Sequence, residues 1–415
     1  MSVEPTATGS AGCRCCGHEA EELVLSAKGF PALCNAFDVD AARARAMPTG
    51  RFELLACTRC GSLRNAAFDP DLLPYDDRYE NSLHGSGTFG SFASELAADL
   101  AAWRPLTDAT VVEVGSGQGD FLRVLAEHGP GHAYGLDPSL VSPVEITDAA
   151  APITLLPGTL DDLVDLPKAD LLLSRHVLEH VTDPLAMLTE MRERFAQTGT
   201  AIYVEVPDAT YMVQTPALWD LIHEHVGYFT AAGLRAVLQR AGWTVDEVGR
   251  SFGDQYLWAR ATCSADAAGT GTAGSDGVTG DASVEAPAET IAAARRFGQV
   301  HGDSTRRWTT FLDQARQDGK RVAVWGAGSK GVAFLNAIAA TDAGAGALAA
   351  IDAVIDVNER KRHRFVPGVG TVVETPGEVA GRIDTVLVMN PIYLAEIRAT
   401  GETLGFDAEY LAVDA

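Results

Sequence analysis

Three glycines between two predicted strands are the part of this sequence best suited to hold a small molecule. They lie in the run VVEVGSGQGD and are Gly115, Gly117 and Gly119. The next predicted strand ends at Asp137, which Pro138 follows, about twenty residues beyond the first glycine. Glycines at a strand-to-helix turn let a ligand lie against bare backbone, and an acid ending the second strand can accept both ribose hydroxyls. The spacing therefore predicts a cofactor that contains adenosine.

Two details indicate which cofactor this is. The spacing Gly-x-Gly-x-Gly lacks the third glycine that packs a helix over a dinucleotide pyrophosphate. Glu113 lies inside the strand before the loop, where an acid repels a phosphate and favours a cationic or amino-acid ligand. The loop resembles motif I of class I S-adenosylmethionine (SAM) methyltransferases. With SAM, we expect Glu113 to accept from the methionine amino group, Ser116 and the glycine backbone to lie under the sulfonium, and Asp137 to hold the ribose.

Cysteines are concentrated near the N-terminus in the spacing of a metal knuckle. Two Cys-x-x-Cys pairs occur, formed by Cys13, Cys16, Cys57 and Cys60. Two residues between ligands let a tight turn aim both sulfurs at one metal. We therefore predict a structural Zn²⁺, because a closed four-sulfur site leaves no position for a substrate. Cys15 or Cys34 could replace one of the four, and a set of buried structural thiols is the alternative interpretation.

A loop dense in histidines and aromatics follows a core strand. In WDLIHEHVGYFT, which covers 219–230, His223 and His225 flank Glu224. The pKa of histidine suits proton abstraction, and an adjacent carboxylate can orient an imidazolium. The spacing is not that of a zinc hydrolase. The alternative is a polar loop that caps the following helix through Thr230.

Two further histidines follow the predicted strand 169–174. They are His176 and His180, and they lie at the sheet edge where ligands bind in α/β proteins. His180 could be a base or a wall of the cofactor pocket. His176 is better interpreted as a wall or core residue.

A second glycine loop begins another α/β unit near the C-terminus. The run from Gly326 to Gly331 includes Gly328 and Lys330, follows a strand and opens a helix, so its amides suit a phosphate or pyrophosphate. Asp356 ends the next strand as in an NAD site, but the basic residues Arg360, Lys361, Arg362 and Arg364 follow it. In a chain of net charge −24, that cluster indicates an anionic ligand. Helix–strand packing with balancing surface charges is the alternative.

Composition limits the partners and the compartment. A net charge of −24 repels nucleic acid and anionic membranes, although local cations can still bind one nucleotide. No run approaches the roughly 20 apolar residues that span a bilayer, and a signal-peptide pattern is missing, so we expect a cytoplasmic protein. Seven cysteines in such a protein do not indicate a disulfide framework. The oligomeric state is open, and a monomer is compatible with the sequence.

Strands and helices alternate between about 110 and 262, and again after 320, which predicts open parallel sheets with crossover helices. Between them, 263–286 consists mostly of Ala, Gly, Ser, Thr and Asp. We therefore predict an α/β fold in four parts. These are a zinc-binding module (1–72), a class I SAM methyltransferase (Rossmann-like) domain (73–262), a flexible linker (263–288) and a C-terminal Rossmann-like substrate-binding domain (289–415).

The combination of motifs resembles the three-domain SAM-dependent C-methyltransferases of nucleotide-activated deoxysugars. The resemblance covers nearly all 415 residues except the linker. Beside the knuckles and the first glycine loop, it rests on PALCNAF, HEHVGYFT, the Gly326 loop and the basic run DVNERKRHRFVPG. Two departures suggest a sister branch, since Ile222 replaces a tyrosine and Met389 a tryptophan of the family.

The resemblance also implies roles for single residues. His225 is the base that removes a proton from the carbon next to a ketone, Glu224 supports it and His180 assists at the enolate. Tyr79 closes over the substrate. The nucleotide diphosphate is held by the Gly326–Gly331 loop, Lys361 and Arg364. Alternatives are O- or N-methylation of a saccharide or related metabolite, favoured by Ile222, and a non-catalytic SAM- or nucleotide-binding scaffold.

Overall fold

The computed structural model describes residues 12–73, 78–162, 166–215, 217–264 and 287–413. Among these residues the strands form three sheets, of four, eight and five strands. Almost all of the predicted linker 263–288 lies outside the described residues, and the domain boundaries stay a prediction. None of the described helices combines the length and the apolar character needed to cross a membrane.

The eight-stranded sheet has the order β11-β12-β9-β8-β4-β5-β7-β6. Its centre, from β9 to β7, is parallel, whereas β6, β11 and β12 pair antiparallel. The strands at its centre are buried on both faces, as expected for a parallel sheet covered by helices. The strand bounds are β4 Thr110–Val114, β5 His132–Asp137, β6 Val144–Ile146, β7 Ile153–Pro157, β8 Leu171–Arg175, β9 Ala201–Pro207, β11 Thr244–Ser251 and β12 Tyr256–Thr262.

Helices cover both faces of this sheet. One face packs on α2 (Gly87–Trp103) and α3 (Asp120–Ala126). The other packs on α4 (Pro184–Phe195) and α6 (Ala231–Arg240). The predicted parallel sheet with crossover helices is therefore confirmed, with an antiparallel addition at each edge.

The C-terminal sheet is parallel throughout and has the order β15-β14-β13-β16-β17. This is the strand order of a doubly wound Rossmann-like sheet, with its topological switch between β13 and β16. The strand bounds are β13 Val322–Trp325, β14 Ile351–Ile355, β15 Val373–Glu374, β16 Thr385–Val388 and β17 Glu409–Ala412. The helices are α7 Pro287–Gln317, α8 Ser329–Ala339, α9 Gly344–Leu348, α10 Pro376–Val379 and α11 Leu394–Leu404.

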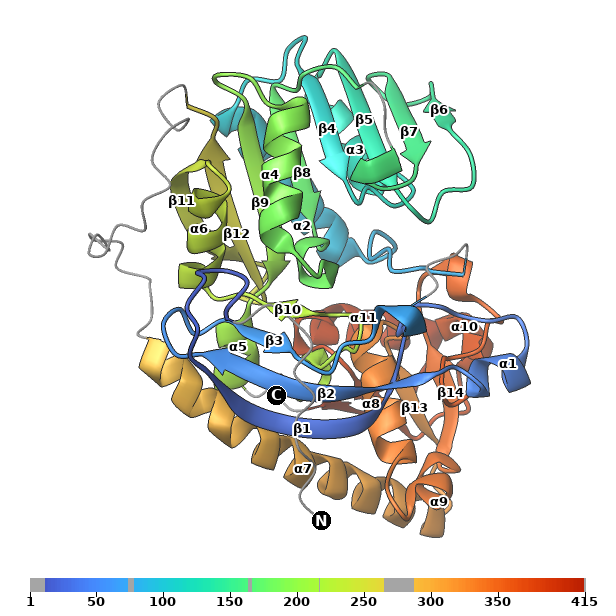
Figure 1. The fold of residues 1–415 in the computed structure, drawn as a ribbon. Coiled ribbons are helices and arrows are strands. Elements are labelled where there is room, and N and C mark those ends of the chain that lie inside the picture. The colour runs from blue at the N-terminus through green and yellow to red at the C-terminus, as the bar shows by residue number, and fades with distance from the viewer. Residues whose placement is uncertain (1–11, 74–77, 163–165, 216, 265–286, 414–415) are drawn as a thin grey trace.

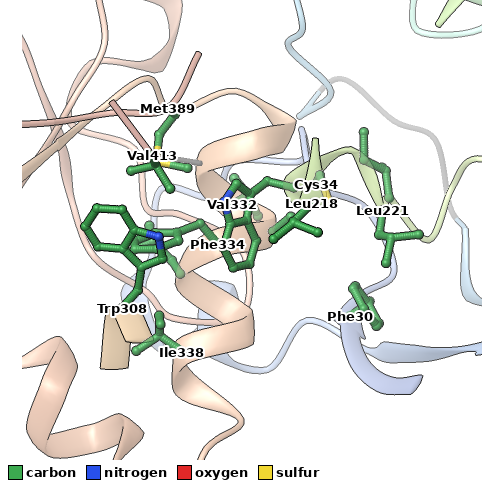
Figure 2. Packing of buried hydrophobic residues seen from close by; sticks show 14 of the residues in the cluster. Phe30, Cys34, Leu218, Leu221, Trp308, Val332, Phe334, Ile338, Met389 and Val413 are labelled. Atoms are coloured by element: carbon green, nitrogen blue, oxygen red, sulfur yellow. The ribbon is translucent and has the colours of Figure 1, made fainter. Parts of the chain in front are cut away.

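The N-terminal sheet does not build a core of its own. It has the antiparallel order β1-β2-β3-β10, and its last strand comes from the middle of the chain. Phe30 packs in one apolar cluster with Trp308 of α7 and Phe334 of α8 (Figure 2), and Phe52 belongs to the same cluster. The long helix α7 lies along this sheet in Figure 1. The bounds are β1 Glu21–Pro31, β2 Thr49–Cys57, β3 Leu63–Asn65, β10 Gly227–Tyr228, α1 Ala41–Arg45 and α5 Ala209–Gln214.

Candidate functional site

A cavity of about 510 Å³ lies where the eight-stranded sheet meets the C-terminal sheet. Its walls include the ends of both central strands, because Gly115 follows β4 and Gly326 follows β13. Most residues predicted to do chemistry line it, namely Tyr79, Glu113, Gly115, Ser116, Gly117, Asp137, Pro138, His180, Glu224, His225, Gly326, Gly328, Lys330 and Lys361. Gly119 and Arg364 do not line it.

Asp137 holds the first glycine loop in shape. One carboxylate oxygen accepts a 2.8 Å hydrogen bond from the amide of Gly117, and the other accepts from the amide of Ser139. Gly115 has a φ of 79° and a Cβ there would lie 2.0 Å from Val177, so only glycine fits. Gly119 is left-handed too, but it precedes α3 and its space is limited by Leu155, so its role is packing.

Glu113 is a buried acid that forms no ion pair among the described residues, although Arg175 lies near enough to lower its pKa. It is 2 % exposed, and its Oε2 has no hydrogen-bond partner among the described residues, as is also true of Ser116 Oγ. Burial raises the pKa of Glu113 to about 7. An ammonium in the cavity would satisfy this carboxylate. The residues of the loop therefore fit the amino-acid end of SAM.

Charged residues next to this loop form a buried network that sequence reasoning missed. Arg175 at the end of β8 pairs with Glu205 of the neighbouring β9, 3.0 Å apart, and both side chains are buried. His176 lies 3.3 Å from Glu205 and 3.7 Å from Glu179. Burial lowers the pKa of His176, but the two carboxylates outweigh this effect and raise the pKa to about 9. A signal was present, because Arg175 directly follows the predicted strand 169–174 and Glu205 is a lone charge in the apolar run AIYVEV.

The three residues of the His-Glu-His loop point to different surroundings. His223 stacks on Phe68 with ring centres 5.7 Å apart, and it does not line the cavity. Glu224 accepts from the hydroxyl of Tyr79 at 3.1 Å and from the amide of Cys34 at 2.9 Å. His225 lies edge-on to His180 with ring centres 4.8 Å apart. The alternative prediction is also fulfilled at the end of the loop, since Thr230 caps α6.

Burial sets the protonation of this group. It raises the pKa of Glu224 to about 7. Burial and the neighbouring His180 lower the pKa of His225 to about 3. Burial also lowers the pKa of His180, whose ring bonds the backbone of Glu224. Both imidazoles are therefore neutral at physiological pH, and each can accept a proton.

Cations in the C-terminal part of the cavity are paired with acids. Lys330 lies 2.6 Å from Asp220, an acid that sequence reasoning missed. The buried ammonium of Lys361 donates to the carbonyl oxygen of Ala327 at 3.0 Å and lies 3.5 Å from Asp356. An anionic ligand in this cavity would therefore meet backbone amides and lysines whose charges are already partly neutralised by acids.

Which basic residues reach the cavity depends on the turn η6 (Glu359–Lys361). Arg360, which directly precedes Lys361, also lines the cavity and bridges Glu80 and Asp120. Arg364 follows the turn and pairs through its backbone with Val373. The geometry gives no support to a phosphate-binding role for Arg364.

The four predicted cysteines come together. Cys13 and Cys60 have sulfurs 3.6 Å apart, as have Cys16 and Cys57, and all four sulfurs lie within 4.8 Å of one another. Tetrahedral Zn²⁺ with bonds of about 2.3 Å places its ligand sulfurs roughly 3.8 Å apart, so the donor set fits this ion. Neither Cys15 nor Cys34 belongs to the cluster, and all seven cysteines are free of disulfides.

Comparison with protein families decides the nature of the central domain. Residues 88–248 match the family described as a methyltransferase domain. The match contains the glycine loop, Asp137 and the His-Glu-His loop.

Residues 88–248 form a class I SAM-dependent methyltransferase domain.

This methyltransferase domain is followed by a second match, because residues 281–406 match the family described as a C-methyltransferase C-terminal domain. Both halves of the cavity thus come from segments that occur in methyltransferases.

Curated relatives match the methyltransferase domain only in part. A tRNA U34 carboxymethyltransferase of Shewanella woodyi is 30% identical over 107 residues, which are 24% of this chain and 32% of that protein. Its counterpart from Shewanella amazonensis is 29% identical over 104 residues, with the same coverage of 24% and 32%. The chain therefore spans about a third of the length of these relatives.

Solved structures are similar at low identity. A SAM-dependent methyltransferase from Mesorhizobium loti has a TM-score of 0.34 and 19% identity, over 42% of this chain and 100% of that chain. The magnesium protoporphyrin IX methyltransferase of Synechocystis PCC 6803 with bound SAH has a TM-score of 0.34 and 18% identity, over 43% of this chain and 84% of that chain. Nothing about the substrate follows from scores this low.

Proposed function

We propose that this chain is a SAM-dependent C-methyltransferase that methylates the carbon next to the ketone of a nucleotide-activated deoxysugar. The observation that carries the proposal is the shared cavity, in which the SAM loop, the buried His180–His225 pair and the C-terminal glycine loop face one space. The match of residues 281–406 to a C-methyltransferase C-terminal domain supports carbon as the acceptor.

The cofactor half of the cavity orients the methyl donor. Glu113 would hold the methionine ammonium, and Asp137 would hold the ribose hydroxyls beside the Gly115–Gly117 turn. When bound, SAM supplies an electrophilic methyl group on a sulfonium that leaves as a neutral thioether.

The reacting carbon needs a base, and neutral His225 is the proposed one. It accepts the proton as the C–H bond breaks, and the electron pair moves to the ketone oxygen as an enolate. His180 would assist at that oxygen, while Tyr79 holds Glu224 and so fixes the loop. The enolate carbon then forms its bond to the methyl carbon as the methyl–sulfur bond breaks.

The C-terminal domain is proposed to hold the nucleotide diphosphate. The N-terminus of α8 opens onto the cavity through Gly328 and Ser329, which suits a phosphate. Lys330 would exchange part of its pairing with Asp220 for the substrate.

The four-cysteine cluster is proposed to hold a structural Zn²⁺. The sulfurs of Cys13, Cys16, Cys57 and Cys60 lie within 4.8 Å of one another, and deprotonation of these thiols would give the thiolate form that binds metal.

Hydrogen exchange of the substrate tests the reaction. Candidate ketosugar nucleotides are incubated with the protein in D₂O without SAM, and deuterium at the carbon next to the ketone is followed by NMR. Exchange that disappears in His225→Ala and persists in the neighbouring His223→Asn supports C-methylation. The His223 ring lies outside the cavity, so this variant separates base loss from loop disturbance.

A second candidate is O- or N-methylation of a saccharide. Ile222 lines the cavity and offers no hydrogen-bond donor to an enolate, which favours a reaction without one. Absence of exchange with every ketosugar, together with methyl transfer to a hydroxyl or amine, would support this candidate. Tight SAM binding without turnover on any extract would instead indicate a non-catalytic scaffold.

A further inference from the structure

Glu179 has a position that none of the roles above uses. It lies in the short turn η3 (Leu178–His180) that follows β8, and it is 1 % exposed. One of its carboxylate oxygens and one ring nitrogen each of His180 and His225 lie within 4.8 Å of one another. The proposed base therefore has a buried acid beside it.

Two atoms of this group lack hydrogen-bond partners among the described residues. They are Oε2 of Glu179 and Nδ1 of His225, and both are buried. Buried polar atoms without a partner are rare in native proteins, so these two atoms call for an explanation. A proton on the imidazole would supply the missing donor.

We propose that Glu179 is a positioning residue for His225, and that its carboxylate stabilises the imidazolium that forms when His225 removes the substrate proton. This inference rests on the proposed function, because it concerns the same base. The transferred proton stays on His225 and Glu179 remains ionised. The enolate carries the balancing negative charge.

Charges around Glu179 keep it ionised without cancelling its effect. His176, which pairs with both Glu179 and Glu205, opposes burial and lowers the pKa of Glu179. The other groups that face the cluster are His180, which burial keeps neutral, Glu224, whose pKa burial raises to about 7, and Tyr228, whose ring centre lies 5.9 Å from that of His225. Burial keeps His225 neutral at physiological pH, so we expect the imidazolium to form together with the enolate.

A bound divalent cation would be another reason for two histidines and a glutamate to lie together. Nitrogen and oxygen ligands of one Zn²⁺, at about 2.1 Å from the metal, lie roughly 3.4 Å apart. Here the three ligand atoms lie within 4.8 Å of one another, and a ring nitrogen of His176 already lies 3.7 Å from the carboxylate of Glu179. The positive charge that a protonated His176 supplies to Glu179 favours a proton over a metal ion.

Backbone contacts keep this cluster in place independently of the carboxylate. The carbonyl oxygen of Glu179 accepts a 2.7 Å hydrogen bond from the amide of Val226, next to His225. The variant Glu179→Gln keeps the volume and this backbone bond, and removes only the charge. It is therefore suited to test the proposal.

The experiment measures kcat against pH and substrate deuterium exchange for the wild-type protein and Glu179→Gln. We expect kcat and exchange to fall by about 100-fold, in the range of general-base effects, while SAM affinity is unchanged. Without the negative charge the imidazolium is less stable, so the acid limb of the kcat profile should move to lower pH. Glu179→Asp, which retains the charge, should recover part of the activity, and the exposed Glu193→Gln should behave as wild type.

Three results would overturn the proposal. One is an unchanged kcat in Glu179→Gln, and another is a loss of kcat with an unmoved acid limb and a lower melting temperature. The third is one divalent cation per chain, beyond that of the cysteines, that metal analysis finds in the wild type and not in the variant. If the wild-type protein catalyses no hydrogen exchange with any ketosugar, the proposed function fails. The role of Glu179 is then tested separately, by measuring the pKa of His225 by NMR in the wild type and in Glu179→Gln.

Discussion

The hydroxyl of Thr230 donates a 2.7 Å hydrogen bond to the carbonyl oxygen of Cys60. Thr230 ends the His-Glu-His loop and caps α6, whereas Cys60 belongs to the second cysteine pair. The strand pair β3–β10 lies close to this bond in the sequence, because β3 begins three residues after Cys60 and β10 ends two residues before Thr230. The cysteine knuckle and the loop that carries His225 are therefore structurally coupled, so a change in one should affect the other.

Metal removal should loosen this loop. We expect a chelator, or Cys57→Ser, to increase hydrogen exchange of residues 223–230 measured by mass spectrometry, because the knuckle that holds Thr230 loses its shape. Thr230→Val should have a smaller effect in the same segment, with a loss of about 1 kcal/mol of stability as for other caps. Cys263→Ser, at a cysteine outside the four-sulfur group, is the control. Equal exchange with and without metal would contradict the coupling.

Loss of Asp137 should weaken SAM binding. A carboxylate that grips hydroxyls contributes charge-assisted bonds of about 1.5–3 kcal/mol, so Asp137→Ala should raise the SAM dissociation constant tenfold or more. Calorimetry measures this constant, with the exposed Asp161→Ala as the control. Binding of NAD instead of SAM to the wild type would refute the cofactor assignment.

SAM binding should depend on pH through Glu113. Its pKa in the folded protein is about 7, above the ordinary value of 4.5, so its contribution to stability is present below pH 4.5 and lost as pH rises through 7. A ligand ammonium needs the ionised form, so SAM should bind roughly tenfold more weakly at pH 5.5 than at pH 7, with proton release. Calorimetry in two buffers should show this in the wild type and in Glu224→Gln. A dependence that persists in Glu113→Gln would assign it to another group.

Lys330 and Asp220 should affect the substrate in opposite directions. Lys330→Gln should raise the KM for the nucleotide sugar about tenfold, because a charged hydrogen bond to phosphate is lost. Asp220→Asn should lower it, because Lys330 is released from its 2.6 Å ion pair. Arg364→Ala should leave KM nearly unchanged, since Arg364 does not line the cavity. SAM affinity, measured in parallel, should not change in any of the three. A lower KM in Lys330→Gln would reject the phosphate site.

Motifs at the ends of regular strands could be predicted from the sequence, whereas their surroundings could not. The apolar run before Gly115 fixes both a buried strand and the place where it ends, so the cofactor loop follows from local pattern alone. The cysteine pairs are equally local. Both features are therefore positioned as their spacing predicts.

Irregular turns and contacts between distant segments could not be predicted from the sequence. Arg360, Lys361 and Arg364 follow one another in a turn without helical or strand period, so their spacing does not say which of them face the cavity. Glu179 and Asp220 lie in short turns of the same kind. The strand β10 has two residues and pairs with a strand that precedes it by more than 150 positions, and no local pattern encodes such a partner.

The apolar face of the N-terminal sheet has a consequence for synthesis of the chain. Phe30 and Phe52 leave the ribosome long before Trp308 and Phe334, which cover them in the folded protein. At about 5–20 residues per second, roughly 15–60 seconds of translation separate these segments. During that interval the nascent sheet exposes apolar surface of the kind that chaperones recognise. The yield of folded protein should therefore depend on chaperones more strongly than for a protein whose domains each fold as soon as they are synthesised.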